Sequence, residues 1–296
     1  MDDRRDDPRL AAAEPWIPVG ELGEAFQSGA GTQHRLARSE RLAGARLALH
    51  FEDGSATDYH FLSATELSRV RDERGAELEA GNREARHGTL RAETPHSYHA
   101  TEIRPGIFFL DFIAPELRAS TMSFVLDLGR GIFTALVASL PDRSELTVPL
   151  IERVRQGGEL TCVDARFLSG AIGSPCTPAT ERHRDSTELV GERIEYAYSA
   201  SERYEHVYLN ERFFTWHCLA GSERALADTD RCRYLKVAEQ LYLFVWREKI
   251  IPTLGAVLVD LAQMKTTGKI FGYRGFDFEA LTNFPVGAQA RRAGVP

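Results

Sequence analysis

The run "QLYLFVWREK", residues 240–249, ends a row of aromatic side chains in a carboxylate. Its alternation of apolar residues predicts a β-strand with every second side chain on one face. One of those faces carries, in order, Tyr242, Phe244, Trp246 and Glu248. If that face is buried, Glu248 points into apolar space, where a lone carboxyl keeps its proton instead of its charge. If the strand ends there, Glu248 is solvated beside Arg247 and Lys249. This run alone leaves both interpretations open.

Further polar side chains precede this strand. The stretch "RIEYAYS" places Tyr196 and Tyr198 on one face. The stretch "RYEHVYL" does the same with Tyr204, His206 and Tyr208. Tyrosine suits a half-wet pocket, since it joins an apolar body to a polar tip, but it is also common on ordinary sheet surfaces. Arg224 follows in "AGSERALADTDRC". If Glu248 faces a cavity, we expect these groups to face it too.

His217 is a further candidate, beside Trp216 and Cys218 in "FFTWHCL". Phenylalanine lies on both faces of this stretch, so its phase does not show whether His217 points inward. Cys218 with His206 or His217 would make a nucleophile and base, but the spacing equally fits a small buried thiol. Asp228 and Asp230 lack the longer acidic ladder of a calcium loop. We expect them in a turn, bonded to their own backbone.

Short alternating stretches fill the chain from residue 44 onward, and long amphipathic helices are hard to find. Many short strands at regular spacing predict an all-β protein of antiparallel sandwiches or barrels. Two series of strands look like a repeat. Gly44 opens one series and Gly191 the other. "Y-HATEIRPGIFFLDF" from Tyr98 aligns without a gap to "Y-LKVAEQLYLFVWRE" from Tyr234.

The repeat predicts two similar β-units. We expect a mobile N-terminal segment over residues 1–40, a first unit over 41–173, a linker over 174–187 and a second unit over 188–296. Within the N-terminal segment, "EPWIPVGELGEAF" has apolar anchors such as Trp16 and Phe26 and is a candidate to dock against the body. In this alignment the first unit has Leu47 and Leu49 at the two tyrosine positions and Phe112 at the position of Glu248. The site is therefore expected in the second unit, together with the larger pocket.

Composition narrows the function classes. The 296 residues carry a net charge of −7, which argues against a nucleic-acid partner because no basic field would neutralise phosphates. The four cysteines form neither a C-x-x-C pair nor a zinc-like spacing, which indicates reduced thiols in a cytoplasmic protein. The N-terminus is charged and does not resemble a secretory signal, and no apolar run approaches the length of a membrane span.

The pattern "RIEYAYSASERYEHVYL … GSER … YLFVWRE" resembles the phenolic acid decarboxylase family. This resemblance covers roughly residues 187–273. It implies a lipocalin-like (calycin-type) barrel that removes the carboxylate of hydroxycinnamic acids without a cofactor. It also implies that Tyr196 and Tyr198 form the family's Tyr-x-Tyr pair, that Arg224 binds the substrate, and that Glu248 is the acidic residue.

Nearly the whole chain after the tail is similar to a second family, the molybdenum cofactor biosynthesis protein F family. The stretches that carry this resemblance are "ERYEHVYLNERFFTWHCL", "LYLFVWREKIIPTLGAVLVDL", "KTTGKIFGYRGFDF" and "YHATEIRPGIFFLDF". That name does not indicate a chemistry, since the sequence has no phosphate loop and no molybdenum-type cysteine site. The internal repeat, together with the barrel that the decarboxylase resemblance implies, predicts tandem lipocalin-like barrels.

If the second barrel keeps decarboxylase-like chemistry, Arg224 would pair with an acidic substrate and the tyrosines would hydrogen-bond its carboxylate or phenol. Glu248 would be the general acid, kept protonated by its apolar wall. The substrate-binding set is expected to include Arg224, Trp246, Phe244, Tyr208, His206 and His217. The same groups would serve an isomerase or a cyclase. The pattern is also compatible with a lipocalin-like protein that only binds small apolar ligands, and with an accessory partner in a pathway.

We expect a small aromatic or apolar acid as the ligand, no cofactor and no metal, no membrane or nucleic-acid partner, and a possible homodimer. In the first unit, His50, His60, His99 and Asp111 would be the residues of some other site. Scattered histidines are more often surface or satisfied residues, so we do not predict a metal centre there.

Overall fold

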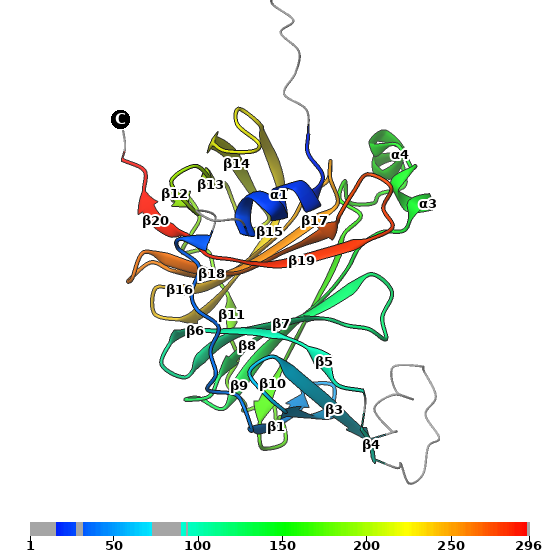
Figure 1. The fold of residues 1–296 in the computed structure, drawn as a ribbon, viewed down its shortest axis with the longest axis vertical. Helices are drawn as coiled ribbons and strands as arrows, with labels where there is room; N and C mark the ends of the chain where they lie inside the picture. Colours follow the sequence, from blue (N-terminus) through cyan, green and yellow to red (C-terminus); the bar gives the residue numbers. More distant parts are fainter. Residues whose placement is uncertain (1–15, 28–31, 73–89, 93, 295–296) are drawn as a thin grey trace, which may run out of the picture.

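The computed structural model describes residues 16–27, 32–72, 90–92 and 94–294, and it consists almost entirely of antiparallel strands (Figure 1). The first sheet contains β1 (Arg46–Phe51), β2 (Ala56–Phe61), β3 (Glu66–Asp72), β4 (Leu90–Ala92), β5 (His96–Ser97), β6 (His99–Arg104), β7 (Ile107–Ile113), β8 (Ser120–Asp127), β9 (Ile132–Ser139) and β10 (Asp164–Ile172). Its order is β4-β3-β2-β1-β10-β9-β8-β7-β6, and β5 pairs with β3. Because β5 leads directly into β6, this pairing brings the two edges together and nearly closes a barrel.

The second sheet contains β11 (Arg184–Asp185), β12 (Arg193–Ala197), β13 (Arg203–Tyr208), β14 (Phe213–Ala220), β15 (Ala227–Ala238), β16 (Leu241–Arg247), β17 (Thr253–Asp260), β18 (Lys265–Tyr273), β19 (Leu281–Val286) and β20 (Gln289–Arg292). Its order is β11-β15-β14-β13-β12-β20-β18-β17-β16, and β19 pairs with β18. Pairing of β15 with β16 closes this barrel. The predicted all-β fold with two tandem barrels is confirmed.

Each barrel has its own core, and a third apolar layer lies between the barrels. Strands β7, β8, β16 and β17 are buried along nearly their whole length. Their inner faces fill their own barrel, and their outer faces pack against the other barrel. This explains why they read as continuous apolar runs. Thr101 bonds Thr267 through the two hydroxyls at 2.8 Å across this layer, and Arg104 Nε lies 2.7 Å from Asp260 Oδ2.

Three helices complete the described part: α1 (Val19–Gln27), α3 (Arg143–Leu146) and α4 (Leu150–Arg155). Although α1 comes first in the chain, it lies over the second barrel (Figure 1). Gly20 N donates to Arg274 O at 3.2 Å, and the ring of Phe26 packs 6.3 Å from that of Phe284. Within the predicted mobile segment over residues 1–40, the stretch with apolar anchors forms this docked helix. No helix among the described residues is long and apolar enough to cross a membrane.

The strand registers correct the alignment of the two repeats. Gly44 and Gly191 do correspond, with φ of +77° and +88°, a backbone conformation that favours glycine. Counted from them, Leu49 and Phe51, not Leu47 and Leu49, stand where the second barrel has its two tyrosines. The alignment had slipped by an even number of residues, which keeps every side chain on its face and so leaves the hydrophobic pattern unchanged.

The same slip affects the position of Glu248. Two equivalent β-hairpins, one in each barrel, carry a bulge. It lies at Glu102/Arg104 between β6 and β7, and at Lys236/Ala238 between β15 and β16. Counted from these bulges, Phe112 corresponds to Trp246 and Ala114 to Glu248. The backbone agrees, since Ala114 N donates to Ser120 O and Glu248 N donates to Thr253 O, both at 2.9 Å.

Candidate functional site

The aromatic face of β16 points into the second barrel. Tyr242, Phe244 and Trp246 belong to its inner core, whereas the alternate residues of the strand pack in the layer between the barrels. Glu248 continues the inner row one step beyond the strand. Its own N–H holds the chain against β17, and Arg247 turns the other way to donate from Nη1 to Val163 O at 2.9 Å. Glu248 is therefore a cavity residue and not a solvated strand end.

The cavity beside Glu248 is small and mostly aromatic. Its volume is about 30 Å³, which is room for a water molecule or two. The residues that line it are Leu22, Phe26, Tyr198, Tyr204, His206, Trp216, Glu223, Trp246, Glu248 and Ile270. The first two belong to α1, so this helix forms one wall. A larger pocket, of about 260 Å³, lies at the first barrel beside Tyr59 and Met122. A pocket of about 530 Å³ lies mainly against β15 and β16 of the second barrel, beside Arg231, Tyr234 and Arg247, so the location of the larger functional pocket stays a prediction.

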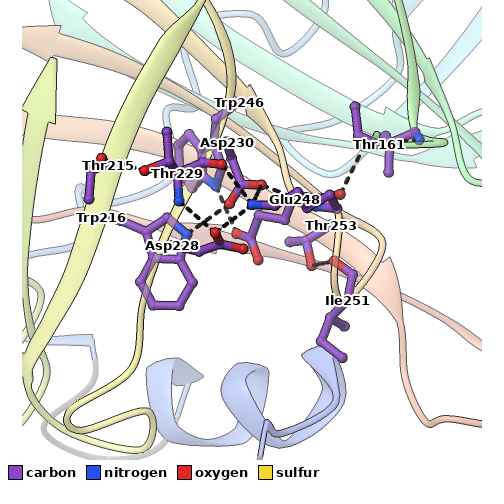
Figure 2. A network of polar contacts seen from close by, with 12 residues as sticks. Thr161, Thr215, Trp216, Asp228, Thr229, Asp230, Trp246, Glu248, Ile251 and Thr253 are labelled. Carbon is purple, nitrogen blue, oxygen red and sulfur yellow. Dashed lines mark hydrogen bonds and ion pairs between the residues drawn. The ribbon is translucent and has the colours of Figure 1, made fainter. Parts of the chain in front are cut away.

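Glu248 sits between the indole of Trp246 and a group of acidic residues (Figure 2). Trp246 Nε1 donates to Glu248 Oε1 at 2.9 Å. The residue as a whole is half-buried, yet protein atoms crowd its carboxyl. Desolvation, and then the charges of Asp230 and Glu223, raise the pKa of Glu248 well above its usual range. We conclude that its carboxyl is held mainly in the protonated form.

Glu223 is the second carboxyl in the cavity, and it is 9% exposed. Tyr204 donates to its Oε2 at 3.0 Å. Burial, followed by the charge of Glu202, raises the pKa of Glu223 to about 7. Near neutral pH this group therefore exchanges readily between acid and carboxylate, as a general acid or base must.

The loop between β14 and β15 aims Glu223 inward and leaves Arg224 exposed. Ser222 donates from both N and Oγ to Glu202, which holds the loop against β13. A side chain at Gly221 would collide with that carboxylate, because its Cβ would lie 2.0 Å from Glu202 Oε2. The next residue along the turn from Glu223 therefore faces solvent. The sequence predicts Arg224 in the cavity, but the structure places Glu223 there.

The remaining predicted site residues lie at different depths in the second barrel. Tyr196 and Tyr208 lie below the cavity, where their hydroxyls bond each other at 2.6 Å, and Phe244 packs beside them. His206 reaches the cavity above them, and burial lowers its pKa to about 3, so its ring is neutral. His217 is exposed on the outer face of β14, because Phe214, Trp216 and Cys218 take the inner face.

Of the nine predicted site residues, the structure gathers Tyr198, His206, Trp246 and Glu248 in the cavity. Tyr196, Tyr208 and Phe244 form the layer beneath it, and Arg224 and His217 lie outside. Sequence reasoning missed the carboxyl of Glu223 and the two helix residues. The inward phase of Tyr204 and Trp216 was a usable signal, but nothing local marks α1 as part of a barrel that begins more than a hundred residues later.

Asp228 and Asp230 lie within strand β15, not in the expected turn. Buried Asp230 accepts from Trp216 Nε1 at 3.0 Å and from the backbone N of Lys249 at 3.2 Å. Asp228 forms an ion pair with the Lys249 ammonium, and Figure 2 shows both aspartates beside Glu248. This network fixes the turn that carries Glu248. Among the described residues, no group of three or more His, Cys, Asp or Glu side chains is placed to hold a metal ion.

Comparison with known proteins gives matches over most of the chain. The family models of the MoaF N-terminal domain and the MoaF C-terminal domain match residues 14–142 and 183–295. Protein MoaF of Klebsiella aerogenes is 48% identical over 201 residues, which are 67% of this chain and 74% of that protein. These matches confirm the predicted resemblance to the molybdenum cofactor biosynthesis protein F family. They do not test the resemblance to phenolic acid decarboxylases.

One solved structure is a protein of Burkholderia vietnamiensis provisionally assigned as a beta-lactamase. It is 13% identical, with a TM-score of 0.30, and the match covers 36% of this chain and 95% of that one. A TM-score this low supports no inference about fold or activity.

Proposed function

We propose that this chain, which belongs to the MoaF family, carries an acid/base catalytic site for a small aromatic molecule in its second barrel. The family itself assigns no chemistry to the cavity. The observation that carries the proposal is the pair of carboxyls, Glu248 and Glu223, both with raised pKa values, that face one aromatic cavity. Titratable groups whose pKa values are shifted towards neutral pH, and which share a cavity, are typical of functional sites.

The two carboxyls have different environments and hence different roles. Glu248 is held protonated and is the proton donor, whereas Glu223 near neutral pH is the carboxylate that accepts a proton. A substrate that lies between them gains a proton at one atom and loses one at another. That exchange is an isomerisation, or an elimination when a leaving group departs. The hydroxyl of Tyr198 has no hydrogen-bond partner among the described residues and so is available to orient the substrate.

The charge of the cavity argues for a neutral or cationic substrate. The described residues that line it include two carboxyls and no lysine or arginine. The carboxylate of a hydroxycinnamic acid would lie beside those groups without the cation that Arg224 was expected to supply. Aromatic walls, by contrast, suit an uncharged ring, and they stabilise a cation by their negative faces. Decarboxylation of a hydroxycinnamic acid is therefore less favoured in this cavity than an acid/base reaction of a neutral or cationic substrate.

A substrate enters only if α1 moves. An apolar cavity of about 150 Å³ holds benzene, and the space of about 30 Å³ present here is far smaller. Leu22 and Phe26 occupy the position that a ring would take, and Phe26 lies 4.7 Å from the ring of Tyr198. Withdrawal of these two side chains would enlarge the cavity without disturbing the barrel strands. The helix therefore acts as a lid in this proposal.

The test is a turnover screen of neutral phenols, aromatic amines and hydroxycinnamic acids, followed by substitution of each carboxyl. For an active compound, Glu248→Gln and Glu223→Gln should each lower kcat/KM by about 10²-fold or more, the usual loss for a general acid or base. The rate should rise with pH through about 7, as Glu223 loses its proton, and this limb should vanish in Glu223→Gln.

The same substitution at exposed Glu211 is the matched control and should leave turnover unchanged. Saturable binding of aromatic compounds with no turnover would instead indicate a binding protein. Release of carbon dioxide from hydroxycinnamic acids, lost in Arg224→Gln, would restore the decarboxylase reading. Either result would overturn the proposal.

A further inference from the structure

A second, larger cleft lies where the two barrels meet, on the side where the chain runs from α1 to β1. This junction cleft has a volume of about 560 Å³. Strand β7 of the first barrel forms one side, and β18 and β19 of the second barrel form the other. In Figure 1, β19 and β7 face each other across this region. None of its lining residues belongs to the cavity that contains Glu248.

The floor of the junction cleft is a buried ion pair. Lys269 Nζ lies 3.1 Å from Asp111 Oδ1, and their side chains are 2% and 5% exposed. Ser123 donates to Asp111 Oδ1 at 2.7 Å, and Asn283 donates to the other carboxylate oxygen. Lys269 also donates to Thr121. Each charge is therefore neutralised by its partner, and the floor contributes little net field.

The rim carries charge that is not neutralised. Arg35 and Arg38 line the cleft, and neither forms an ion pair with any carboxylate of the described residues. Both guanidinium charges act on His99, together with burial, which is the larger cause, to lower the pKa of that imidazole to about 4. The two arginines thus lie close to one ring. In a protein with a net charge of −7, they form a local positive site.

His99 adds a directed donor to this rim. Arg38 Nε donates to His99 Nδ1 at 3.2 Å, so the proton of the neutral ring lies on Nε2. Nε2 is buried and has no hydrogen-bond partner. A buried donor without a partner is costly, which favours the arrival of an acceptor. The acceptor must come from outside the chain, or from a small shift of the rim.

The rim is held in place by both barrels. Ser39 N donates to Ala100 O at 2.8 Å, which ties the segment to β6. On the other side, a side chain at Gly287 would lie 2.9 Å from both Arg35 Cα and His34 O, so this glycine lets the segment pack directly against the second barrel. The arginines are thus pre-organised over the cleft, which lowers the entropic cost of binding an anion.

We propose that the junction cleft binds a small organic anion with a flat apolar body, of the aromatic carboxylate class, through Arg35 and Arg38. The apolar body would pack against Phe109, Phe284 and Pro285, which line the cleft. Paired guanidinium groups match the two oxygens of a carboxylate.

The test is titration calorimetry of the full chain with benzoate and, separately, with inorganic phosphate. Benzoate should bind, and Arg35→Gln and Arg38→Gln should each weaken its Kd by about 10-fold, the usual loss of one charge-assisted hydrogen bond. Arg224→Gln is the matched control, because it removes the same charge from an exposed position outside the cleft. It should leave the Kd unchanged.

A second readout locates the ligand. Benzoate should shift the imidazole NMR signals of His99, and Arg38→Gln should reduce that shift at equal benzoate concentration. The proposal is overturned if benzoate does not bind, or if Arg35→Gln and Arg38→Gln bind it as tightly as the wild type. It is also overturned if phosphate alone binds, or if Arg224→Gln is the variant that weakens benzoate.

Discussion

The two barrels share one frame but differ in what they hold inside it. Where the second barrel has Tyr196 and Tyr198, the first has Leu49 and Phe51, both buried in its core. Where the second barrel ends its inner row in Glu248, the first has Ala114, which is fully buried. Most of the strand order is shared, but β11 and β19 of the second barrel have no counterpart in the first. A polar cavity thus requires only a few substitutions at inward positions, and the same barrel backbone accommodates either an apolar or a polar interior.

The first barrel is not simply an apolar copy. Arg69 is fully buried in it, at the position that Trp216 has in the second barrel. Its Nη2 lies 2.6 Å from Glu116 Oε2, and its guanidinium lies 5.6 Å from the ring of Phe112. One interior therefore contains a cation and the other contains carboxyls. The repeat has diverged in the sign of its buried charge while keeping its strand pairing.

The largest effect on stability is expected when the first barrel is given the acidic residue of the second. Ala114→Glu should lower the free energy of unfolding by about 3 kcal/mol or more, because the new carboxyl would be buried and the buried cation of this barrel, Arg69, is already paired with Glu116. Urea denaturation at pH 7 would measure this loss, and Ala114→Leu would separate the cost of size from that of charge. Unchanged stability would show that packing does not decide which barrel carries the acid.

Removing a carboxyl from the second barrel should have a smaller effect, and one that depends on pH. The pKa of Glu223 is about 7 in the fold against 4.5 in the unfolded chain, so the fold favours its protonated form. Its contribution to stability is complete below pH 4.5 and is lost as pH rises to about 7. Glu223→Gln should therefore gain stability relative to the wild type between pH 5 and pH 8, by up to about 3 kcal/mol.

Urea denaturation of both proteins at the two pH values would measure that difference. Glu211→Gln, at an exposed position, is the control. An equal pH dependence in the wild type and Glu223→Gln would mean that the Glu223 carboxyl is solvated, and it would remove one of the two acids from the proposed site.

The smallest expected effects on stability distinguish Tyr196 from Tyr198. Tyr196→Phe leaves the hydroxyl of Tyr208 without its partner in a buried place, so it should cost about 1–2 kcal/mol of stability. Tyr198→Phe removes a hydroxyl that bonds no described residue and should cost less than about 0.5 kcal/mol. Thermal and chemical denaturation would rank them. The reverse order would show that Tyr198, and not Tyr196, supports the core.

Sequence patterns predicted the features that depend on neighbours along the chain. The period-two reading of β16 placed Tyr242, Phe244 and Trp246 on one inward face, and Glu248 follows them there. The paired Gly44 and Gly191 marked equivalent turns, because both need a positive φ. These signals are local and steric, and they do not depend on the rest of the fold.

The errors arose where the fold joins distant segments or where a turn decides orientation. The ungapped alignment paired Tyr98 with Tyr234, which is two residues away from the register of the two equivalent bulges, so Phe112 was matched to Glu248 when Ala114 holds that place. Arg224 was expected in the cavity, but its neighbour Glu223 lies there instead. The hydrogen bonds from Ser222 to Glu202 hold the turn in the orientation that points Glu223 inward. The apolar anchors of residues 16–26 indicated that this stretch docks, but the surface on which α1 packs is formed by β18 and β19, and no local pattern shows that.

That docking also has a consequence for how the protein is made. Residues 19–27 leave the ribosome before any strand, but β18 and β19, on which they pack, come almost last. The first barrel can close early in translation, whereas the apolar side of α1 must wait through the synthesis of both barrels. The chain also crosses between the barrels twice, once after α1 and once before β11. A protease that nicks only the later crossing would cut the chain in two, and the docking of α1 on β18 and β19 would still hold the two pieces together without a covalent bond.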